Sequence, residues 1–258
     1  MSTQQPTIVL VHGAFAESAS WNPVIDRLYH HGTAMVAGHH HHFRDVVTVA
    51  NPLRSLTGDA EYVRDVLRSI EGPIVLVGHS YGGMVITQAA AGCDSVVALV
   101  YVAAFAPDHG ESAFQLSTMF PGSTLGDTLT AYPISTGGDE VAIRHELFHH
   151  QFAADVPSGL AALMAATQRP AALTALSEGL TTDRPAWKDI PSWFVYGEQD
   201  LNIPAALVRF QAERAGSRGT RQVAGGSHAI SVSNPDAVAD TILDAVAAAR
   251  SPEPVAAS

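Results

Sequence analysis

The chain has 258 residues, 47% of them hydrophobic, which is enough to bury one large core or two small ones. Fourteen basic residues stand against 25 acidic ones, and the net charge of −11 without a Lys/Arg cluster argues against a nucleic acid or an anionic membrane as partner. The start, MSTQQPTIVL, lacks the pattern of a signal peptide and no segment approaches the ~20 apolar residues of a membrane helix, so the sequence predicts a cytoplasmic protein.

Five short apolar runs rich in valine and isoleucine predict strands that are covered on both faces, as in a parallel sheet. They are TIVLV (7–11), VVTVA (46–50), PIVLVG (73–78), VVALVYV (96–102) and SWFVYG (192–197). Amphipathic stretches with helix-start residues lie between and after them, at Asn22-Pro23, at Asp59 and at Asn234-Pro235. This alternation predicts a doubly wound, mostly parallel α/β sheet that binds its ligand at the carboxyl ends of the strands.

Residues 104–190 interrupt the alternation, because they contain no comparable strand. Bulky apolar residues recur there at roughly helical spacing: Phe114, Met119, Phe120, Leu147, Phe148, Phe152, Leu163 and Met164. The pattern predicts a mostly helical lid insertion over the sheet edge, with part of its apolar surface lining a pocket. The chain then divides into an α/β core (1–103 and 191–250), the lid (104–190) and a frayed tail (251–258).

The stretch VLVGHSYGG (75–83) places a serine between glycines directly after a predicted strand. A serine at a sharp strand-to-helix turn sits in a strained conformation with its hydroxyl exposed, and its neighbours must be small so that strand and helix can cross closely. Gly78, Gly82 and Gly83 meet that requirement. The N–H of Tyr81, at the start of the following helix, can face developing negative charge. The stretch therefore predicts that Ser80 is a nucleophile.

A serine hydroxyl needs a base and an oxyanion site to attack a carbonyl. Asp200 follows the predicted strand at 192–197, which is the place expected of the acid, and His228 lies in the later loop Gly-Gly-Ser-His, which suits the base. The loop HGAF after the first strand offers the second oxyanion donor, the N–H of Ala14, with that of Phe15 as the alternative.

Together the GHSYG, HGA, GEQD and GGSH segments resemble the α/β-hydrolase superfamily. The HGA loop and the Asp-to-His spacing are similar to the branch that holds plant methyl-ester esterases, hydroxynitrile lyases and bacterial pyrethroid-hydrolase-like esterases. The resemblance implies that Ser80, Asp200 and His228 are nucleophile, acid and base, and that Ala14 and Tyr81 supply the oxyanion N–H groups. The lyases carry a lysine after the catalytic histidine, whereas Ala229 stands here, which argues against cyanohydrin cleavage. The serine argues against the haloalkane dehalogenases and the epoxide hydrolases whose nucleophile is an aspartate.

Two other functions compete with this reading. The segment His145-Glu146-Leu147-Phe148-His149 matches HExxH, which on a helix turns two histidines toward a zinc ion with the glutamate as general base. Asp155 is a conceivable third ligand, but the glycine of the longer metzincin pattern is replaced by Phe152. The second alternative is a non-catalytic homologue that binds a small hydrophobic ligand.

A stretch at 33–45 departs from the resemblance and looks like an insertion. Its four consecutive histidines, His39 to His42, can bind Ni²⁺ or Zn²⁺ adventitiously through neutral imidazoles. Because the stretch precedes a strand, we expect it at the amino ends of the strands, opposite the catalytic loops.

The sequence therefore predicts a carboxylesterase that hydrolyses a small to medium hydrophobic ester through an acyl-enzyme, with neither cofactor nor metal. Lactone or amide hydrolysis and cofactor-free oxygen or peroxide chemistry use similar triads, so these reactions stay open at this point. Neither the individual substrate nor the oligomeric state follows from the residues.

Overall fold

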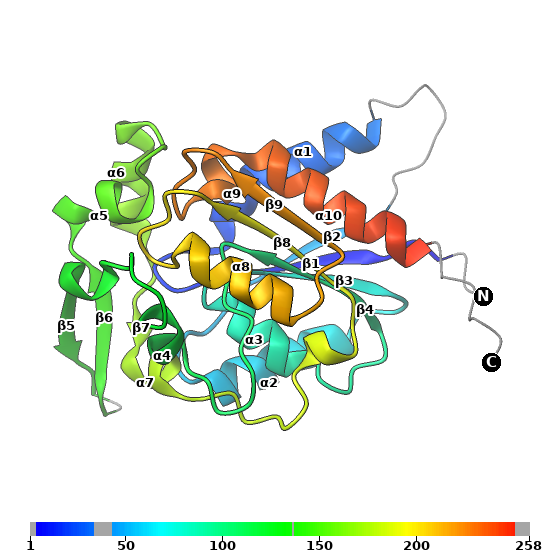
Figure 1. Cartoon of the computed structure of the whole chain (residues 1–258), viewed down its shortest axis with the longest axis horizontal. Helices are drawn as coiled ribbons and strands as arrows, with labels where there is room; N and C mark the ends of the chain where they lie inside the picture. Colours follow the sequence, from blue (N-terminus) through cyan, green and yellow to red (C-terminus); the bar gives the residue numbers. More distant parts are fainter. Residues whose placement is uncertain (1–3, 34–42, 136, 251–258) are drawn as a thin grey trace.

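The computed structural model describes residues 4–33, 43–135 and 137–250. Its centre is a six-stranded sheet with the order β2-β1-β3-β4-β8-β9, in which every neighbouring pair is parallel (Figure 1). The strands are β1 (Thr7–Val11), β2 (Val46–Val49), β3 (Ile74–His79), β4 (Val96–Val102), β8 (Ser192–Gly197) and β9 (Gly219–Val223). This arrangement confirms the predicted doubly wound parallel sheet, including all five predicted strands.

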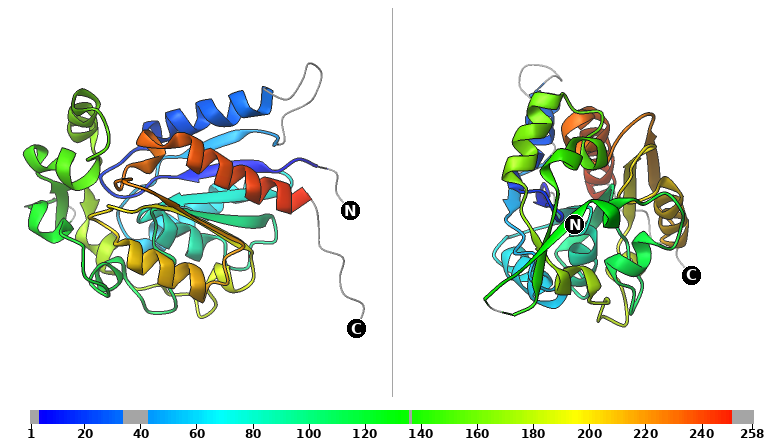
Figure 2. Two further views of the ribbon diagram at one scale, coloured as in Figure 1. Left: turned by 45° about the horizontal axis from the view of Figure 1, so that its top comes forward. Right: turned by 90° about the vertical axis from the view of Figure 1, so that its left-hand side faces the viewer.

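Alternate residues of the strands face opposite sides of the sheet, and each side has its own apolar core. In β1, Ile8 and Leu10 join the core beneath α1 and α10, whereas Val9 and Val11 join the core shared with α2, α3 and α8 (Figures 1 and 2). Burial on both sides explains why β1, β3, β4 and β8 are apolar runs, whereas the edge strand β9 is polar and largely exposed. The helices of the core are η1 (Ser18–Trp21), α1 (Asn22–Thr33), α2 (Leu56–Arg68), α3 (Gly82–Ala89), α8 (Ala205–Arg214), α9 (Ile230–Ser233) and α10 (Pro235–Arg250).

One predicted helix start was wrong. The sequence suggested that the second helix begins at Asp59, but α2 begins at Leu56, with the hydroxyl of Ser55 accepting the N–H of Gly58 at 3.1 Å as the N-cap. Asp59 instead lies inside the first turn and is fully buried.

The region predicted as a lid lies over the carboxyl ends of the strands, at the end of the molecule opposite the first described residues (Figures 1 and 2). It is not wholly helical, because it contains a small antiparallel sheet of three strands, β5-β6-β7. Its elements are α4 (Ala113–Ser117), η2 (Leu125–Thr128), β5 (Leu129–Pro133), β6 (Asp139–Ile143), α5 (His145–Phe152), α6 (Ser158–Thr167), β7 (Ala171–Ala172), α7 (Leu173–Ser177) and η3 (Ala186–Lys188). The division of the chain at 104 and 190 stays a prediction.

Arg54, in the loop between β2 and α2, ties this region to the core. Its guanidinium donates to the carboxylate of Glu140 in β6 and, at 3.1 Å, to the carbonyl oxygen of Pro170. The N–H of Ala172 in turn donates to the carbonyl oxygen of Leu53 at 3.0 Å. These bonds anchor the small sheet beside the carboxyl ends of β1 and β2.

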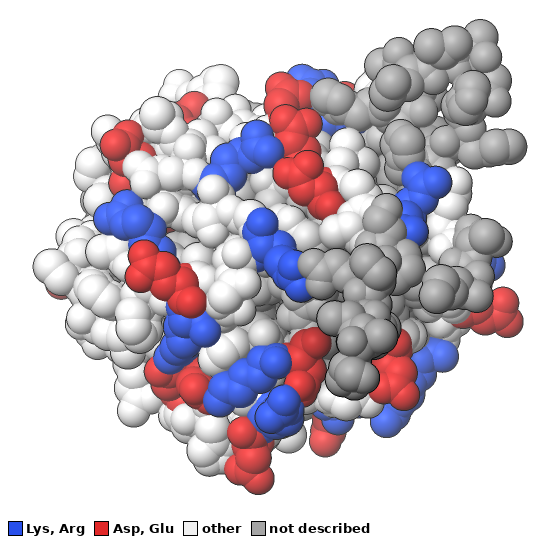
Figure 3. Space-filling view, turned by 45° about the vertical axis from the view of Figure 1, so that its right-hand side comes forward, with Lys and Arg blue, Asp and Glu red and all other residues white. Residues whose placement is uncertain are grey.

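Charged residues of both signs are interspersed on the face shown in Figure 3, without a continuous basic area among the residues coloured there. One ion pair joins α1 to α10, where Nε of Arg27 lies 2.6 Å from Oδ1 of Asp236. No helix in the described ranges is both long enough and apolar enough to cross a bilayer. The predicted absence of a nucleic-acid partner stays a prediction, and the histidines at 39–42 and the tail at 251–258 lie outside the described residues.

Candidate active site

Ser80 occupies the sharp turn that the sequence predicted between β3 and α3. Its φ is +56°, in the left-handed region that side chains rarely adopt. The glycines after it are required by close approach, because a Cβ on Gly82 would lie 2.6 Å from the carbonyl oxygen of Val11 and one on Gly83 would lie 2.1 Å from that of Phe105. The serine is 8% exposed, so the turn presents its hydroxyl to a nearly closed space.

Asp200 and His228 meet at the same end of the sheet, from the loops after β8 and β9. Nδ1 of His228 lies 2.7 Å from Oδ2 of Asp200, and both side chains are 0% exposed. The other carboxylate oxygen of Asp200 accepts the N–H groups of Asn202 at 2.8 Å and Ile203 at 2.9 Å. Because Asp200 uses both oxygens, its orientation is held by three hydrogen bonds, and His228 is held in the tautomer that carries its proton on Nδ1.

The second ring nitrogen of His228 is buried and has no hydrogen-bond partner among the described residues. A histidine that acts as base for Ser80 would accept the proton at this nitrogen. No hydrogen bond joins the two side chains within the described ranges, as is common before substrate binds. The imidazole packs edge to face against Phe152, with ring centroids 4.8 Å apart, and lies 4.7 Å from the ring of His79.

His79 was not among the predicted site residues. It is buried, and its Nε2 lies 3.1 Å from the carbonyl oxygen of His228, so it donates to the backbone of the histidine loop. Burial, together with the neighbouring ring of His228, lowers the pKa of His79 well below its ordinary value. A neutral imidazole next to Ser80 therefore supports the position of His228.

The loop after β1 lies directly against Ser80. A Cβ on Gly13 would come within 3.1 Å of Oγ of Ser80, so the backbone of this loop passes close to the hydroxyl. Within the described residues, the N–H groups of Ala14 and Tyr81 donate no hydrogen bond. Two unused N–H groups on either side of a serine hydroxyl are what an oxyanion requires.

Phe15, the alternative oxyanion donor, is already engaged. Its N–H donates to the carbonyl oxygen of Arg169 at 3.0 Å, and its φ is +60°. Ala14 is therefore the better placed of the two donors that the sequence suggested.

A buried carboxylate holds the side chain of Tyr81. The hydroxyl of Tyr81 donates to Oδ2 of Asp59 at 2.9 Å, while Oδ1 of Asp59 accepts the N–H of Arg54 at 3.0 Å. Burial raises the pKa of Asp59 above its ordinary value, and it also raises that of the Tyr81 hydroxyl. The sequence predicts only a helix-start role for Asp59, because its partner lies 22 positions along the chain.

His12 holds the oxyanion loop from beneath. Its Nδ1 donates to the carbonyl oxygen of Gly13 at 2.9 Å, and its Nε2 accepts the N–H of Asn51 at 3.0 Å. The amide of Asn51 donates back to the carbonyl oxygen of His12 at 3.0 Å. Burial lowers the pKa of His12 to about 4, and the positive charge of Arg169 adds to the effect.

This lowered pKa predicts acid destabilisation. The folded state takes up the His12 proton near pH 4, whereas the unfolded chain takes it up near 6.5. Stability from the neutral ring is therefore fully present above about pH 6.5 and is lost as the pH falls toward 4, up to about 3 kcal/mol. We expect the unfolding free energy from urea titrations to fall less between about pH 7 and pH 5 in His12→Gln than in the parent. If the unfolding free energies of the two proteins fell equally with pH, the buried neutral ring of His12 would not be the source of this pH dependence.

A small cavity of about 30 Å³ lies at Ser80, and it is lined from both the core and the lid. Ile203 contributes from the core, and Phe105, Phe114, Leu125 and Leu176 contribute from the region predicted as the lid. Asn202, which the sequence analysis did not single out, lines it as well. The surroundings of Ser80 are thus mostly apolar, with few polar groups.

The HExxH segment forms α5, but the described residues do not bring its histidines to a third ligand. His145 and Glu146 are exposed, and Nε2 of His149 donates to the carbonyl oxygen of Val156 at 2.9 Å. The last residue of this helix is Phe152, which packs on His228. The helix therefore forms part of the wall around the histidine.

Asp155, the conceivable third zinc ligand, is bonded elsewhere. One carboxylate oxygen accepts the hydroxyl of Ser227, and the other accepts the amide of Asn234 at 3.1 Å. The Oγ of Ser227 also accepts the N–H of Ala229 at 3.2 Å. Asp155 thus connects the segment after α5 to the loop that carries His228.

Comparison with known proteins finds a match over most of the chain. Residues 8–241 match the model of the alpha/beta hydrolase family. The carbendazim hydrolyzing esterase of Nocardioides sp. (strain SG-4G) is 48% identical over 60 residues, which cover 21% of this chain and 25% of that protein.

Two solved structures share the fold at low sequence identity. Polyneuridine aldehyde esterase superposes with a TM-score of 0.76 at 20% identity, covering 93% of this chain and 99% of that one. A pyrethroid hydrolase from Sphingobium faniae JZ-2 superposes with a TM-score of 0.69 at 20% identity, covering 96% of this chain and 98% of that one.

Proposed function

Because this chain belongs to the alpha/beta hydrolase family, we propose that it is a serine hydrolase that cleaves carboxylic esters, with Ser80, His228 and Asp200 as its triad. The family and the parallel sheet confirm the resemblance and the fold class that the sequence predicted. The observation that carries the proposal is the buried hydrogen bond between His228 and Asp200 at the end of the sheet where Ser80 occupies its strained turn.

In the first half of the reaction, His228 Nε2 takes the proton of the Ser80 hydroxyl as Oγ attacks the ester carbonyl. The carbonyl oxygen becomes an oxyanion and accepts the N–H groups of Ala14 and Tyr81. Asp200 stabilises the imidazolium through Nδ1. Collapse of the intermediate breaks the bond to the alcohol oxygen, which leaves with the proton from Nε2, and the acyl group stays on Ser80.

In the second half, water replaces the alcohol. His228 takes a proton from the water as it attacks the acyl carbonyl, and the same two N–H groups hold the new oxyanion. The bond to Ser80 Oγ then breaks, Oγ recovers its proton from Nε2, and the carboxylic acid leaves. No step requires a group from outside the chain other than water.

The substrate proposed for this site is a neutral, hydrophobic ester of small to medium size. The lining of the Ser80 cavity is mostly apolar and holds no charged residue among the described side chains. The named activities of the similar proteins, toward carbendazim and pyrethroids, are those of hydrolases that act on neutral compounds. We also propose that residues 104–190 act as the lid, since Phe114, Leu125 and Leu176 close the cavity.

Inhibitors separate this proposal from the zinc alternative at His145, Glu146 and His149. We expect a serine-directed phosphonate to abolish ester turnover and to add its mass to the peptide that contains Ser80, because an oxyanion site that binds a tetrahedral intermediate also binds a phosphonate. EDTA is expected to leave turnover unchanged. Loss of activity with EDTA and survival with the phosphonate would sink the serine mechanism and favour the zinc hydrolase.

A further inference from the structure

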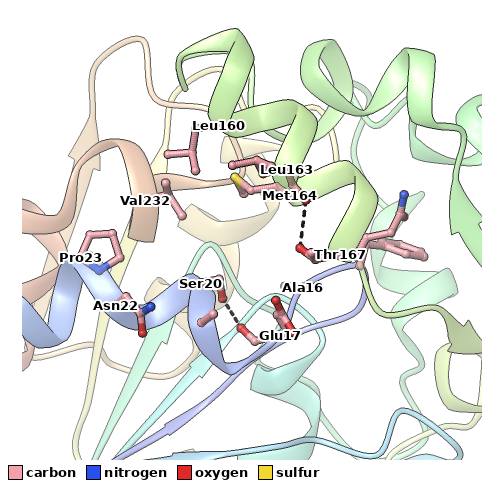
Figure 4. A pocket seen from close by; sticks show the side chains of 13 residues that line it. Ala16, Glu17, Ser20, Asn22, Pro23, Leu160, Leu163, Met164, Thr167 and Val232 are labelled. Atoms are coloured by element: carbon pink, nitrogen blue, oxygen red, sulfur yellow. Dashed lines mark hydrogen bonds between the residues drawn. The ribbon is translucent and has the colours of Figure 1, made fainter.

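A second, larger cavity of about 280 Å³ lies between the start of α1 and the lid helix α6. Figure 4 shows Leu160, Leu163 and Met164 reaching from α6 toward Pro23 and Val232. Leu160 and Leu163 are 42% and 64% exposed, which is unusual for leucines of a short helix and indicates an apolar wall open to solvent.

The chemistry of this cavity suits an uncharged apolar group. Among the described residues that line it there is no lysine or arginine, and Glu17 is the one acidic residue. The hydroxyls of Ser20 and Thr167 donate to backbone carbonyl oxygens, at 2.6 Å and 3.0 Å, so they offer no free donor to a ligand (Figure 4). The volume of this cavity is near the lower limit for small-molecule sites. Like those sites, it is lined mostly by apolar side chains with a few polar groups.

Phe15 connects this cavity to the nucleophile, because it lines both cavities. The Ser80 cavity of about 30 Å³ is far smaller than the second cavity of about 280 Å³. The bulkier half of an ester therefore fits better in the larger cavity. The backbone of Phe15 is held by its bond to Arg169, so rotation of its side chain is the smallest movement that would join the two spaces.

The position of the histidine loop indicates which half of the ester enters the larger cavity. Helix α9 continues directly from the loop that carries His228, and its Val232 lines the larger cavity. No residue of that loop or of α9 lines the Ser80 cavity. Since His228 gives its proton to the departing alcohol, the alcohol half must lie on the side of that loop.

We propose that the cavity between α1 and α6 is the subsite for the apolar alcohol group of the ester, with Phe15 as the specificity-determining residue between this subsite and Ser80. This proposal rests on the serine hydrolase function proposed above. The acyl half stays in the smaller cavity, so the preferred substrates are esters of short acids with bulky apolar alcohols. In the acylation step the carbonyl carbon bonds to Ser80 Oγ, the bond to the alcohol oxygen breaks, and the neutral alcohol is left in the subsite.

Filling the subsite tests the proposal. Met164→Trp places a larger side chain in the cavity, and Met119→Trp is the matched control, because Met119 is 44% exposed and lines neither cavity. We expect Met164→Trp to lower the ratio of kcat/KM for 1-naphthyl acetate to that for ethyl acetate at least tenfold, and Met119→Trp to leave it unchanged. Phe15→Ala should raise the same ratio. Leu163→Trp provides a second filling variant at an exposed position, where folding is least affected.

Two outcomes would overturn the subsite: a ratio that stays unchanged in both filling variants, including an equal loss on both esters, or a selective loss on methyl 1-naphthoate, which carries its bulk on the acyl half. A binding assay separates this proposal from the proposed function. The Ser80→Ala protein should bind 1-naphthol, measured by fluorescence, at least tenfold more tightly than Ser80→Ala combined with Met164→Trp. Equal binding would overturn the subsite even if esters are hydrolysed. Tighter binding without ester turnover in the parent would sink the serine hydrolase function, and with it the alcohol role, but would leave the cavity as a binding site for an apolar group.

Discussion

Replacing Ser80 with alanine is expected to lower ester turnover by about four orders of magnitude or more, with the fold unchanged. The nucleophile, the base and the acid act as a unit, so losing the hydroxyl removes the acyl-enzyme path altogether. Alanine is smaller than serine and Ser80 makes no hydrogen bond through its hydroxyl that the fold depends on within the described residues. The left-handed backbone at this position is kept by the strand and helix on either side.

The measurement is kcat for an activated acetate ester, together with the urea unfolding midpoint. Ser69→Ala is the matched control, because Ser69 is exposed after α2 and its hydroxyl bonds only to the carbonyl oxygen of Val66. The control is expected to keep its kcat within about threefold of the parent value. This corresponds to a change in the activation free energy of less than ~1 kcal/mol. Retention of more than about a tenth of the activity in Ser80→Ala would reject Ser80 as the nucleophile.

Asp200→Asn is expected to lower kcat by about four orders of magnitude. The carboxylate accepts the Nδ1 proton of His228 at 2.7 Å, and an amide that turns its NH₂ toward this nitrogen would favour the tautomer that carries its proton on Nε2. A ring with its proton on Nε2 cannot accept one from Ser80. The substituted amide also lacks the charge that stabilises the imidazolium in a site where both side chains are fully buried.

Asp108→Asn is the control for this substitution, because Asp108 also follows a strand of the central sheet, β4. Its carboxylate lies 2.6 Å from Nζ of Lys188 at the partly exposed surface and makes no contact with His228. The expected change in kcat is less than about threefold. An essential Asp108 with a dispensable Asp200 would show that the acid has been assigned to the wrong strand.

The small sheet of the lid shows where reading the sequence failed. Strand β5 is short and largely exposed, and in β6 only Val141 and Ile143 are buried, so neither strand forms the apolar run by which the central strands were predicted. A usable signal was present, because Gly137 and Gly138 both adopt positive φ in the turn between the two strands, and paired glycines are typical of hairpin turns. Apolar residues at helical spacing dominate this region, so the sequence predicts helices there.

The sequence by itself determined the central sheet and the place of each proposed triad residue. Strands buried on both faces must be apolar along their whole length, and parallel strands bring their carboxyl ends to one edge. The positions of Ser80 and Asp200 after two such strands, with His228 in the loop before the last helix, were therefore enough to predict that the three residues lie at the same end of the sheet. The bond between Asp200 and His228 agrees with that expectation.

Only the tertiary structure decided what surrounds these residues. The bond of Asp59 to Tyr81, the connection of Asp155 to Ser227 and the contact of Phe152 with His228 join segments far apart in the chain. The sizes of the two cavities on either side of Phe15 depend on how side chains from the core and the lid fill space. Side-chain packing of this kind depends on contacts that exist only in the folded chain. It leaves no periodic pattern in the sequence, because periodicity records only which face of each helix or strand is buried.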